Sequence, residues 1–519
     1  MTTLTLTPGA LTLADCRRIA AGGVRLALVP DAWERIDASA ATVAAMAAGD
    51  AAVYGVNTGF GKLAQTRIAR DQLDTLQRNL VLSHAAGVGE PLAPGVVRLV
   101  LALKIASLAH GLSGVRRATV EALIALLNAD ALPLIPSQGS VGASGDLAPL
   151  AHLSAVLLGE GTITLAGAAM PAAAALAKLG LQPLALGPKE GLALLNGTQV
   201  STALALTGLF AAEENFAAAL AAGALTTDAV MGSDAPFDSR IHVARGQPGQ
   251  IAVAQALARL MEGSAIRASH TDCGRVQDPY SIRCQPQVLG ACLDVMVSAA
   301  AAFQREANGV SDNPLVFAAD GAILSGGNFH AEPVALWADA LALAVAEIGA
   351  LAERRIALLI DGALSGLPPF LTADPGLNSG FMIAHVTAAA LASENKSLAH
   401  PASVDSLPTS ANQEDHVSMA TFAARRLGPM NRHVAHILGI ELLAAAQGIE
   451  FRRPLATSPA LERLHAAVRR FAPAMATDRL IAPDLAAAAA FVAEGGIRRT
   501  LEVPLALPSD GAGGTVTKA

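Results

Sequence analysis

Hydrophobic residues recur with helical spacing over most of the chain, and the longest such runs lie beyond Asn196. Apolar residues three and four positions apart share one face of a helix, so these runs predict long helices. Residues 361–380, rich in Gly and Pro, predict a loop, and Gly428 followed by Pro429 is expected to kink the last long helix. The predicted long helices cover about 200–222, 287–308, 331–360, 382–397 and 415–447.

Shorter helical patterns alternate with loops in the first part of the chain. Residues 31–48 predict a helix that Asp31 caps. The run GVVRLVLALKIASLAHGL, which starts at Gly95, is apolar almost all round and predicts a buried helix. The run LAPLAHLSAVLLGEG predicts a helix with Asp146 as its N-cap and Gly159 at its end.

The length of 519 residues predicts two or three domains. We expect an N-terminal domain over 1–198 and an elongated helical-bundle domain with C-terminal helices over 199–519. Hydrophobic residues make up 52% of the chain and aromatic residues only 3%. Cores of Ala, Leu and Val favour close-packed helices, so the predicted fold class is mainly α.

The formal charge of −7 argues against a nucleic-acid partner. Each of the most apolar stretches carries an acidic residue or falls short of the roughly 20 apolar residues of a membrane span, so we expect no membrane partner. The start, MTTLTLTPGALTLAD, lacks the pattern of a signal peptide, which favours the cytoplasm. His270 and Cys273 have the spacing of metal ligands, but no second ligand pair follows, and we expect no metal.

Two glycine-rich segments were compared with the glycine spacing of nucleotide-binding motifs. YGVNTGFGK (54–62) has Val56 where a P-loop needs Gly, and Leu63 follows Lys62 in place of Ser or Thr. GSVGASG (139–145) spaces its glycines by threes and follows no clear strand pattern. Nucleotide binding is therefore disfavoured.

The chain has only two tyrosines, Tyr54 and Tyr280, and both lie in polar, turn-rich stretches. A phenol close to Arg283 or to a buried amide is a reasonable proton-transfer group. A purely structural hydroxyl is the equal alternative.

Polar clusters recur in apolar surroundings and predict a site assembled from distant segments. Each alone has a structural explanation. Asn196 and Asn313 suit turns, and His330 suits a core position in which its polar atoms are hydrogen-bonded. Glu414 with Asp415 suits a helix cap. Together they indicate a site on a helical scaffold. The clusters are LSHAAG (82–87), LLNGTQ (194–199), SDNPLVF (311–317), GGNFHAE (326–332) and TSANQEDHVS (409–418).

The segment GSVGASGDLAPLAHL (139–153) resembles the signature of the aromatic amino acid ammonia-lyases. In that family an internal Ala-Ser-Gly cyclises to a 4-methylidene-imidazole-5-one group (MIO). Further blocks resemble the branch that acts on histidine, in order from about residue 50 to 450, among them YGVNTGFGKLA, NLVLSHAAGVGE, VQDPYSIRCQPQ and PASVDSLPTSANQEDHVSM. The resemblance implies a fumarase/aspartase-like fold with a long central helical bundle, and a homotetramer whose sites combine several chains.

The resemblance makes Ala143, Ser144 and Gly145 the residues that form MIO, so no external cofactor is expected. The amide nitrogen of Gly145 attacks the carbonyl carbon of Ala143, and the Ser144 hydroxyl is lost as water. Glycine suits position 145 because a Cβ would obstruct this attack. Assistance by the Asp146 carboxylate is a hypothesis.

The resemblance also implies a role for each remaining site residue. Arg283 binds the substrate carboxylate through its guanidinium fork. Tyr54, on a loop over the pocket, and Tyr280 are both candidates for the base that removes the β-proton. The other implied site residues are Asn196 close to the ring and the amino group, Gln277, Asn313 and Phe329 along the pocket, and Glu414 near the substrate's side chain.

Ser83, His84 and Glu414 resemble the histidine-specific branch and indicate the substrate. A histidine and a carboxylate suit an imidazole, which both donates and accepts hydrogen bonds. Against a phenyl ring each polar group would stay unpaired at a cost of about 1–3 kcal/mol. The implied reaction converts L-histidine to trans-urocanate and ammonia, in histidine breakdown.

Three alternatives stay open at this point. A tyrosine or phenylalanine ammonia-lyase, or an aminomutase, shares the MIO chemistry. An enzyme of the related fumarase and aspartase group would leave Ser144 unmodified. A helical scaffold without activity would need none of these motifs. Whether the electrophile captures the amine or the aromatic ring is also open.

Overall fold

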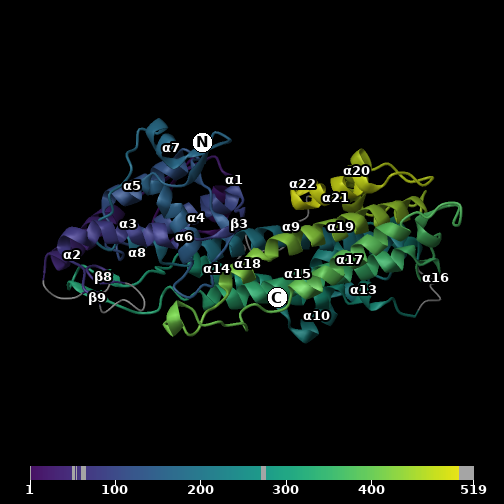
Figure 1. Cartoon of the computed structure of the whole chain (residues 1–519). Helices are drawn as coiled ribbons and strands as arrows, with labels where there is room; N and C mark the ends of the chain where they lie inside the picture. Colours follow the sequence, from purple (N-terminus) through teal and green to yellow (C-terminus); the bar gives the residue numbers. More distant parts are fainter. Residues whose placement is uncertain (1, 50–52, 54, 60–65, 271–275, 502–519) are drawn as a thin grey trace. The chain divides into compact units, whose positions relative to one another are not determined.

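The computed structural model describes residues 2–49, 53, 55–59, 66–270 and 276–501 (Figure 1). Helices dominate these residues, and the mainly α prediction is confirmed. Tyr54 and Cys273 lie outside the described residues.

The chain divides into two compact units, each built from three segments. Unit 1 comprises Met1–Thr207, Ala300–Asp339 and Pro401–Arg425; unit 2 comprises Gly208–Ala299, Ala340–His400 and Arg426–Ala519. The division falls inside three long helices, so neither unit is one continuous stretch. The predicted boundary between residues 198 and 199 stays a prediction.

Unit 1 combines short helices with small sheets. β1 pairs with β2 in parallel, and the other pairs, β3 with β5, β4 with β6, β6 with β7, and β8 with β9, are antiparallel. Its elements are β1 (Thr2–Leu6), α1 (Leu13–Ala21), β2 (Val24–Leu28), α2 (Pro30–Ala48), η2 (Arg70–Gln72), α3 (Leu73–His84), β3 (Val88–Pro91), α4 (Pro94–Leu108), α5 (Arg117–Asn128), β4 (Leu132–Pro133), β5 (Pro136–Gln138), α6 (Leu147–Ala155), η3 (Val156–Leu158), β6 (Thr162–Leu165), β7 (Ala168–Pro171), α7 (Ala172–Lys178), α8 (Glu190–Leu195), β8 (Leu315–Phe317), β9 (Ala322–Leu324), η6 (Ser410–Asn412) and α18 (Ala420–Arg425).

Unit 2 contains a bundle of long helices that run alongside one another, as Figure 1 shows for α15, α17 and α19. The three helices that the division crosses are α9 (Gln199–Ala229), α14 (Gln285–Ala307) and α15 (Glu332–Ile360). The remaining elements are η4 (Ala235–Phe237), α10 (Ser239–Arg245), α11 (Pro248–Met261), α12 (Ala265–Ser269), α13 (Tyr280–Arg283), α16 (Gly362–Ser365), η5 (Pro369–Leu371), α17 (Met382–Leu398), α19 (Leu427–Glu450), α20 (Pro459–Phe471), α21 (Ala482–Ala493) and α22 (Gly496–Thr500).

One helix start differs from the sequence prediction, and one helix end agrees with it. α2 begins at Pro30 with Val29 in the N-cap position, so Asp31 lies inside the first turn and does not cap. Pro fits there because its missing N–H would have no partner in the first turn. Gly159, in contrast, ends the α6–η3 run in a left-handed conformation, as predicted.

The predicted helix over 415–447 is wrong at its start and in the position of its break. Residues 415–419 are not helical, and the helical path is interrupted at Arg426, two residues before Gly428. Pro429 lies in the first turn of α19, where proline is tolerated. The predicted loop over 361–380 contains two short helical turns, α16 and η5.

Three helices, α9, α14 and α15, are long and apolar enough to cross a membrane by length and composition alone. The sequence argument that their apolar stretches fall short is therefore wrong on length. In the structure 83%, 56% and 61% of the respective apolar windows are buried inside the protein. The absence of a membrane partner stays a prediction.

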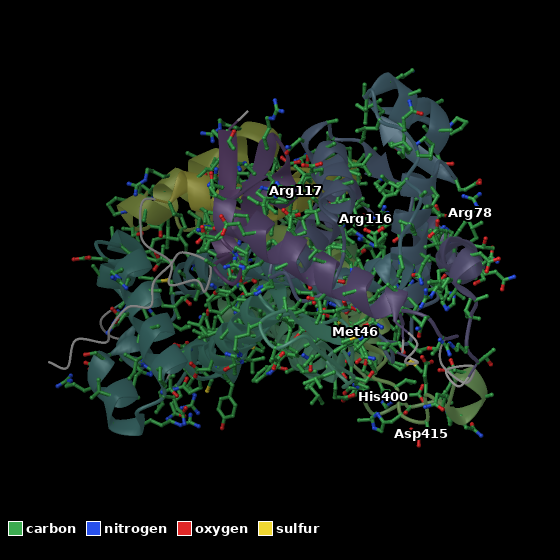
Figure 2. The ribbon with its side chains drawn as sticks, turned by 90° about the vertical axis from the view of Figure 1, so that its left-hand side faces the viewer. Met46, Arg78, Arg116, Arg117, His400 and Asp415 are labelled. Carbon is green, nitrogen blue, oxygen red and sulfur yellow. The ribbon has the colours of Figure 1, made fainter. Side chains whose placement is uncertain are left out.

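Two buried charges in unit 1 hold the helix that leads to Asn196. Arg116, which is labelled in Figure 2, lies at the start of α5. It pairs with the buried Glu190 of α8 at 2.5 Å, and Thr119 donates to the same carboxylate at 2.6 Å. Lys104 of α4 is 1% exposed, and its Nζ donates to the carbonyl oxygens of Ala193 at 3.1 Å and Asn196 at 2.7 Å. Both ends of α8 are therefore fixed from outside the helix.

A buried ion pair joins the helices of unit 2. The Nε and Nη2 atoms of Arg355 on α15 lie 2.5 and 2.8 Å from the two carboxylate oxygens of Glu441 on α19, and both side chains are fully buried. Thr226 of α9 donates to the same carboxylate at 2.9 Å. One buried polar cluster thus ties α9, α15 and α19 together.

We predict that Arg355→Met lowers the free energy of unfolding by about 3–5 kcal/mol, because it leaves the Glu441 carboxylate buried without its cation. Urea denaturation measures the loss. Arg240→Met is the matched control: its guanidinium is 88% exposed beside Asp238, and solvent screens an exposed pair so that it contributes little to stability. Equal effects of the two substitutions would contradict this assignment.

A second prediction concerns Lys104, whose pKa burial lowers from 10.5 to about 8. Between these values the unfolded chain binds a proton that the folded chain releases, so rising pH increases the free energy of unfolding. Lys104→Met removes this contribution. The free energy of unfolding of the wild type, measured relative to that of K104M, should therefore increase between about pH 7.5 and about pH 9.5. Urea denaturation at both pH values measures the gain.

The exposed Lys178 supplies the matched control, Lys178→Met. That variant should follow the pH dependence of the wild type. Parallel pH profiles for the wild type and K104M would show that Lys104 keeps its proton in the folded chain.

Candidate active site

The loop over residues 139–145 is packed closely against two other segments of unit 1. Gly142 and Gly145 have φ values of +67° and +73°, in the left-handed region. A Cβ at position 142 would lie 2.3 Å from Ser418 Oγ, and one at position 145 would lie 2.2 Å from the carbonyl oxygen of Gly197. Glycine is thus required here both by conformation and by space.

The Asp146 carboxylate joins three segments behind this loop. It is fully buried and accepts hydrogen bonds from Ser140 Oγ at 2.9 Å, from Thr421 Oγ1 at 2.6 Å, and from both the backbone N and the Oγ of Ser201 at 2.7 and 2.9 Å. Asp146 occupies the N-cap position of α6, but its side chain does not cap that helix. The carboxylate instead fixes the loop to the starts of α9 and α18.

A cavity of about 340 Å³ lies over the loop, within unit 1. Six of the predicted site residues line it, contributed by segments up to 271 residues apart in the sequence. These residues are Ala143, Ser144, Asn196, Asn313, Phe329 and Glu414. Their catalytic and binding roles stay predictions.

Ser144 and Glu414 are in direct contact in this cavity: the serine hydroxyl donates to Glu414 Oε1 at 2.6 Å. Thr409 and Ser410 donate to the other oxygen, at 2.5 and 3.0 Å. Partial burial raises the pKa of the Glu414 carboxyl, but the three hydroxyl donors outweigh burial and hold the pKa below its ordinary value. Glu414 is therefore a hydrogen-bond acceptor at neutral pH.

Asn196 reaches the cavity from the end of α8, where its N–H closes the helix on Leu192. Its side-chain Oδ1 is buried and has no hydrogen-bond partner among the described residues. An unpartnered buried oxygen is costly unless a ligand group satisfies it. Asn313 is held differently, since its Oδ1 accepts from the backbone N of Gly326 at 2.6 Å.

Ser83 and His84 lie at the end of α3 and do not line the cavity. Nδ1 of His84 lies 2.8 Å from the carbonyl oxygen of Leu80, and the Ser83 hydroxyl donates to the same carbonyl at 3.2 Å. His84 nevertheless contributes to the lowered pKa of Glu414 through its electrostatic interaction with that carboxylate. His84, though not Ser83, is thus close enough to Glu414 for an electrostatic effect.

The predicted residues Gln277, Tyr280 and Arg283 belong to unit 2. Gln277 and Arg283 line a different cavity, of about 550 Å³. The Arg283 guanidinium carbon lies 4.7 Å from the ring centroid of Tyr280, whose side chain is 70% exposed. Nε of Arg283 is buried and has no partner among the described residues. Tyr54 lies outside the described residues.

Five further residues line the first cavity and were not selected as site residues from the sequence. His330 and Asp415 were given structural explanations, a core position and a helix cap, and the other three were not singled out. Four of the five belong to the polar clusters around Phe329 and Glu414, and Ser325 directly precedes the first of these clusters. The residues are Ser325, His330, Gln413, Asp415 and His416.

A family model described as aromatic amino acid lyase matches residues 11–470. Histidine ammonia-lyase of Paracidovorax citrulli is 64% identical over 487 residues, which cover 94% of this chain and 95% of that protein.

Solved structures of the same family have the same fold. The crystal structure of histidine ammonia-lyase from Trypanosoma cruzi is 41% identical, with a TM-score of 0.89 over 96% of this chain and 95% of that one. Tyrosine aminomutase from Streptomyces globisporus is 35% identical, with a TM-score of 0.90 over 96% and 98%. The fold is that of the fumarase/aspartase-like helical superfamily, as predicted. This chain belongs to the aromatic amino acid lyase family and is a carbon–nitrogen lyase.

Proposed function

We propose that this protein eliminates ammonia from L-histidine to give trans-urocanate, in the cytoplasm, as a step of histidine breakdown. The observation that carries the proposal is the contact between Ser144 and the ionised Glu414 in a cavity that Asn196 also lines. The high identity to proteins named histidine ammonia-lyase supports the same substrate.

The proposal includes closure of residues 143–145 into MIO. The Gly145 nitrogen bonds to the carbonyl carbon of Ala143, and the oxygen of that carbonyl leaves as water. A second water is released from Ser144, formed from its hydroxyl and its Cα hydrogen. The residues fit this group, because Gly145 lies too close to Gly197 for any side chain and the glycine conformation permits a tight turn. When formed, MIO supplies an electrophilic methylidene carbon, which no ordinary side chain offers.

Asp146 supports the closure by holding the loop. Its carboxylate already accepts four hydrogen bonds, from Ser140, Ser201 and Thr421. Those contacts fix both flanks of the turn, which is where strain in a closing ring must be resisted. A direct part for Asp146 in the closure stays a hypothesis.

Loss of the Ser144 hydroxyl would also change Glu414. Oε1 would lose its present donor, while Oε2 would keep the hydroxyls of Thr409 and Ser410. One oxygen of a fixed carboxylate would then be free to accept the N–H of a substrate imidazole. His84 adds a second polar group near the same carboxylate. We propose that this arrangement selects histidine.

The substrate carboxylate needs a cation, and the described residues that line the cavity include no Arg or Lys. We propose that Arg283 of another copy binds it, together with Tyr280 and Gln277, in a homotetramer with shared sites. The unpartnered Nε of Arg283 and the exposed phenol of Tyr280 support this arrangement. Either Tyr54 or Tyr280 then removes the β-proton.

A second candidate function is a tyrosine lyase or aminomutase of the same family. The close structural likeness to a tyrosine aminomutase favours it. The higher identity to a histidine ammonia-lyase, 64% against 35%, opposes it. The Glu414 carboxylate opposes a phenylalanine substrate, because a phenyl ring offers it no donor.

The first test supplies L-histidine, L-tyrosine and L-phenylalanine separately and follows the ultraviolet absorbance of the conjugated acrylate product. We expect product from histidine alone. Ser144→Ala should lower the rate by about 10³-fold or more, as when a covalent catalytic group is removed. Mass spectrometry of the wild-type peptide that spans Ala143 to Gly145 should show two missing waters, which the variant cannot lose. Product from tyrosine would overturn the assignment of histidine as the substrate. Activity in a protein whose Ser144 is unmodified would overturn the formation of MIO.

The second test compares two glycine substitutions. Gly145→Ala should abolish ring closure and activity, because its Cβ would meet the Gly197 carbonyl. Gly167→Ala is matched in conformation, with a φ of +80° against +73°, but nothing lies within 4 Å of its Cβ. It should lower the free energy of unfolding by only about 1–2 kcal/mol. The peptide that spans residues 143–145 should still have the mass of the closed ring. Complete ring closure in G145A would show that close packing is not the constraint.

A further inference from the structure

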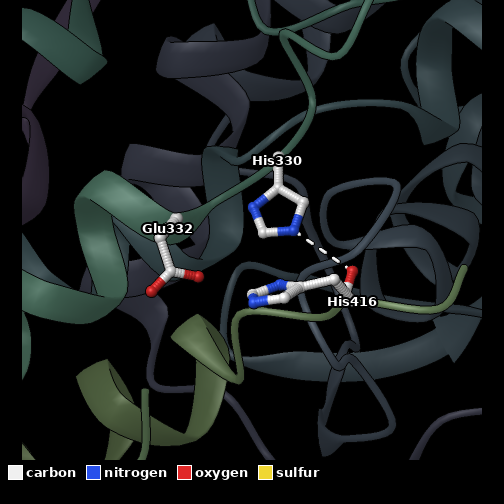
Figure 3. Close-up of side chains that lie close together, drawn as sticks. All are labelled: His330, Glu332 and His416. Atoms are coloured by element: carbon white, nitrogen blue, oxygen red, sulfur yellow. Dashed lines mark hydrogen bonds between the residues drawn. The ribbon is translucent and has the colours of Figure 1, made fainter. Parts of the chain in front are cut away.

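Three metal-ligating side chains of unit 1 lie close together, and two of them, His330 and His416, line the Ser144 cavity. His330 lies between β9 and α15, Glu332 is the first residue of α15, and His416 lies in the non-helical segment before α18. One ligand atom from each of the three side chains can be chosen so that all lie within 4.8 Å of one another. Figure 3 shows the two imidazoles one above the other and the carboxylate beside them.

One oxygen of the Glu332 carboxylate has no partner among the described residues. This oxygen, Oε2, is buried. A buried carboxylate oxygen without a donor or cation is costly, and such oxygens in native proteins usually serve a ligand. The arrangement therefore leaves room for a positive charge at this point.

The hydrogen bond of His330 prepares its other nitrogen for a cation. Nε2 lies 3.2 Å from the backbone oxygen of His416, which can only accept, so Nε2 carries the proton. Nδ1 then keeps its lone pair, and Figure 3 shows this second nitrogen on the side of Glu332. A carbonyl that fixes the tautomer of a histidine in this way is the usual support of a metal ligand.

We propose that His330, Glu332 and His416 bind one divalent transition-metal ion, with Zn²⁺ as the best fit. Two imidazoles and one carboxylate form a ligand set that Zn²⁺ accepts with a fourth position open, whereas Ca²⁺ and Mg²⁺ prefer oxygen ligands alone. Ligand atoms around tetrahedral zinc lie roughly 3–3.5 Å apart, so small side-chain rotations close the present spacing.

The site has an entry path and a consequence for its neighbours. His330 and His416 line the cavity, and His416 is exposed, so an ion reaches them from solvent. Glu414 precedes His416 by two residues. A bound ion would tie this segment to the start of α15 and restrict the position of Glu414. The proposal does not depend on which substrate the enzyme takes.

The experiment measures binding, not turnover. The full chain is freed of metal with a chelator, and Zn²⁺ is titrated by isothermal calorimetry. Co²⁺ replaces it in a second sample, where visible absorption bands report tetrahedral coordination. We expect one ion per chain. Glu332→Gln, which keeps the shape of the side chain, should weaken Zn²⁺ binding by at least about tenfold.

His416→Gln keeps the test informative if E332Q folds poorly, because His416 is exposed and its replacement leaves the core intact. It too should weaken Zn²⁺ binding and abolish the Co²⁺ bands. His400→Gln, which removes an exposed histidine of unit 2, is the control and should bind like the wild type. Less than one ion per wild-type chain, or unchanged binding in both E332Q and H416Q, would overturn the site.

Discussion

The buried carboxylate of Asp146 fixes the geometry on which the candidate site depends. Ser140 lies before the Ala-Ser-Gly turn, Ser201 lies at the start of α9, and Thr421 lies in α18, so one anion joins segments 281 residues apart. Hydrogen bonds to a buried charge contribute about 1.5–3 kcal/mol each. Because Asn196 and Glu414 are only a few residues from two of these anchors, the carboxylate also sets their distance from Ser144.

Local sequence pattern was sufficient for most helices and failed where distant contacts decide the backbone. The apolar run of α4 is buried as its composition predicts. Residues 415–419 continue a helical pattern, yet Met419 donates its backbone N–H to Val141 and Ser418 donates to the carbonyl of Gly142, each at 2.9 Å or less. Bonds to a loop far earlier in the chain replace helical ones there, and no local pattern encodes that competition.

At the candidate site, too, the sequence indicated the residue types but not their proximity in space. The residue types at Ser144, Asn196 and Glu414 indicated reactive chemistry from the sequence, and resemblance to known enzymes ordered them. Their meeting in one cavity depends on contacts across up to 271 positions, which a single sequence does not reveal. His416 was missed for a related reason: in a polar loop, a histidine that lines a cavity and one that faces solvent have the same local pattern.

The small residues of the loop serve close packing, although a run of glycines is usually taken as a sign of flexibility. Gly142 lies against Ser418 and Gly145 against Gly197, at distances that exclude any side chain, and Asp146 N donates to the Gly197 carbonyl at 2.7 Å. A turn that must hold strain needs rigid surroundings and little bulk of its own. Glycine supplies the small volume and the conformation, while the neighbouring segments supply the rigidity. The loop is therefore constrained from outside, which is the condition under which a peptide can react with itself without unfolding.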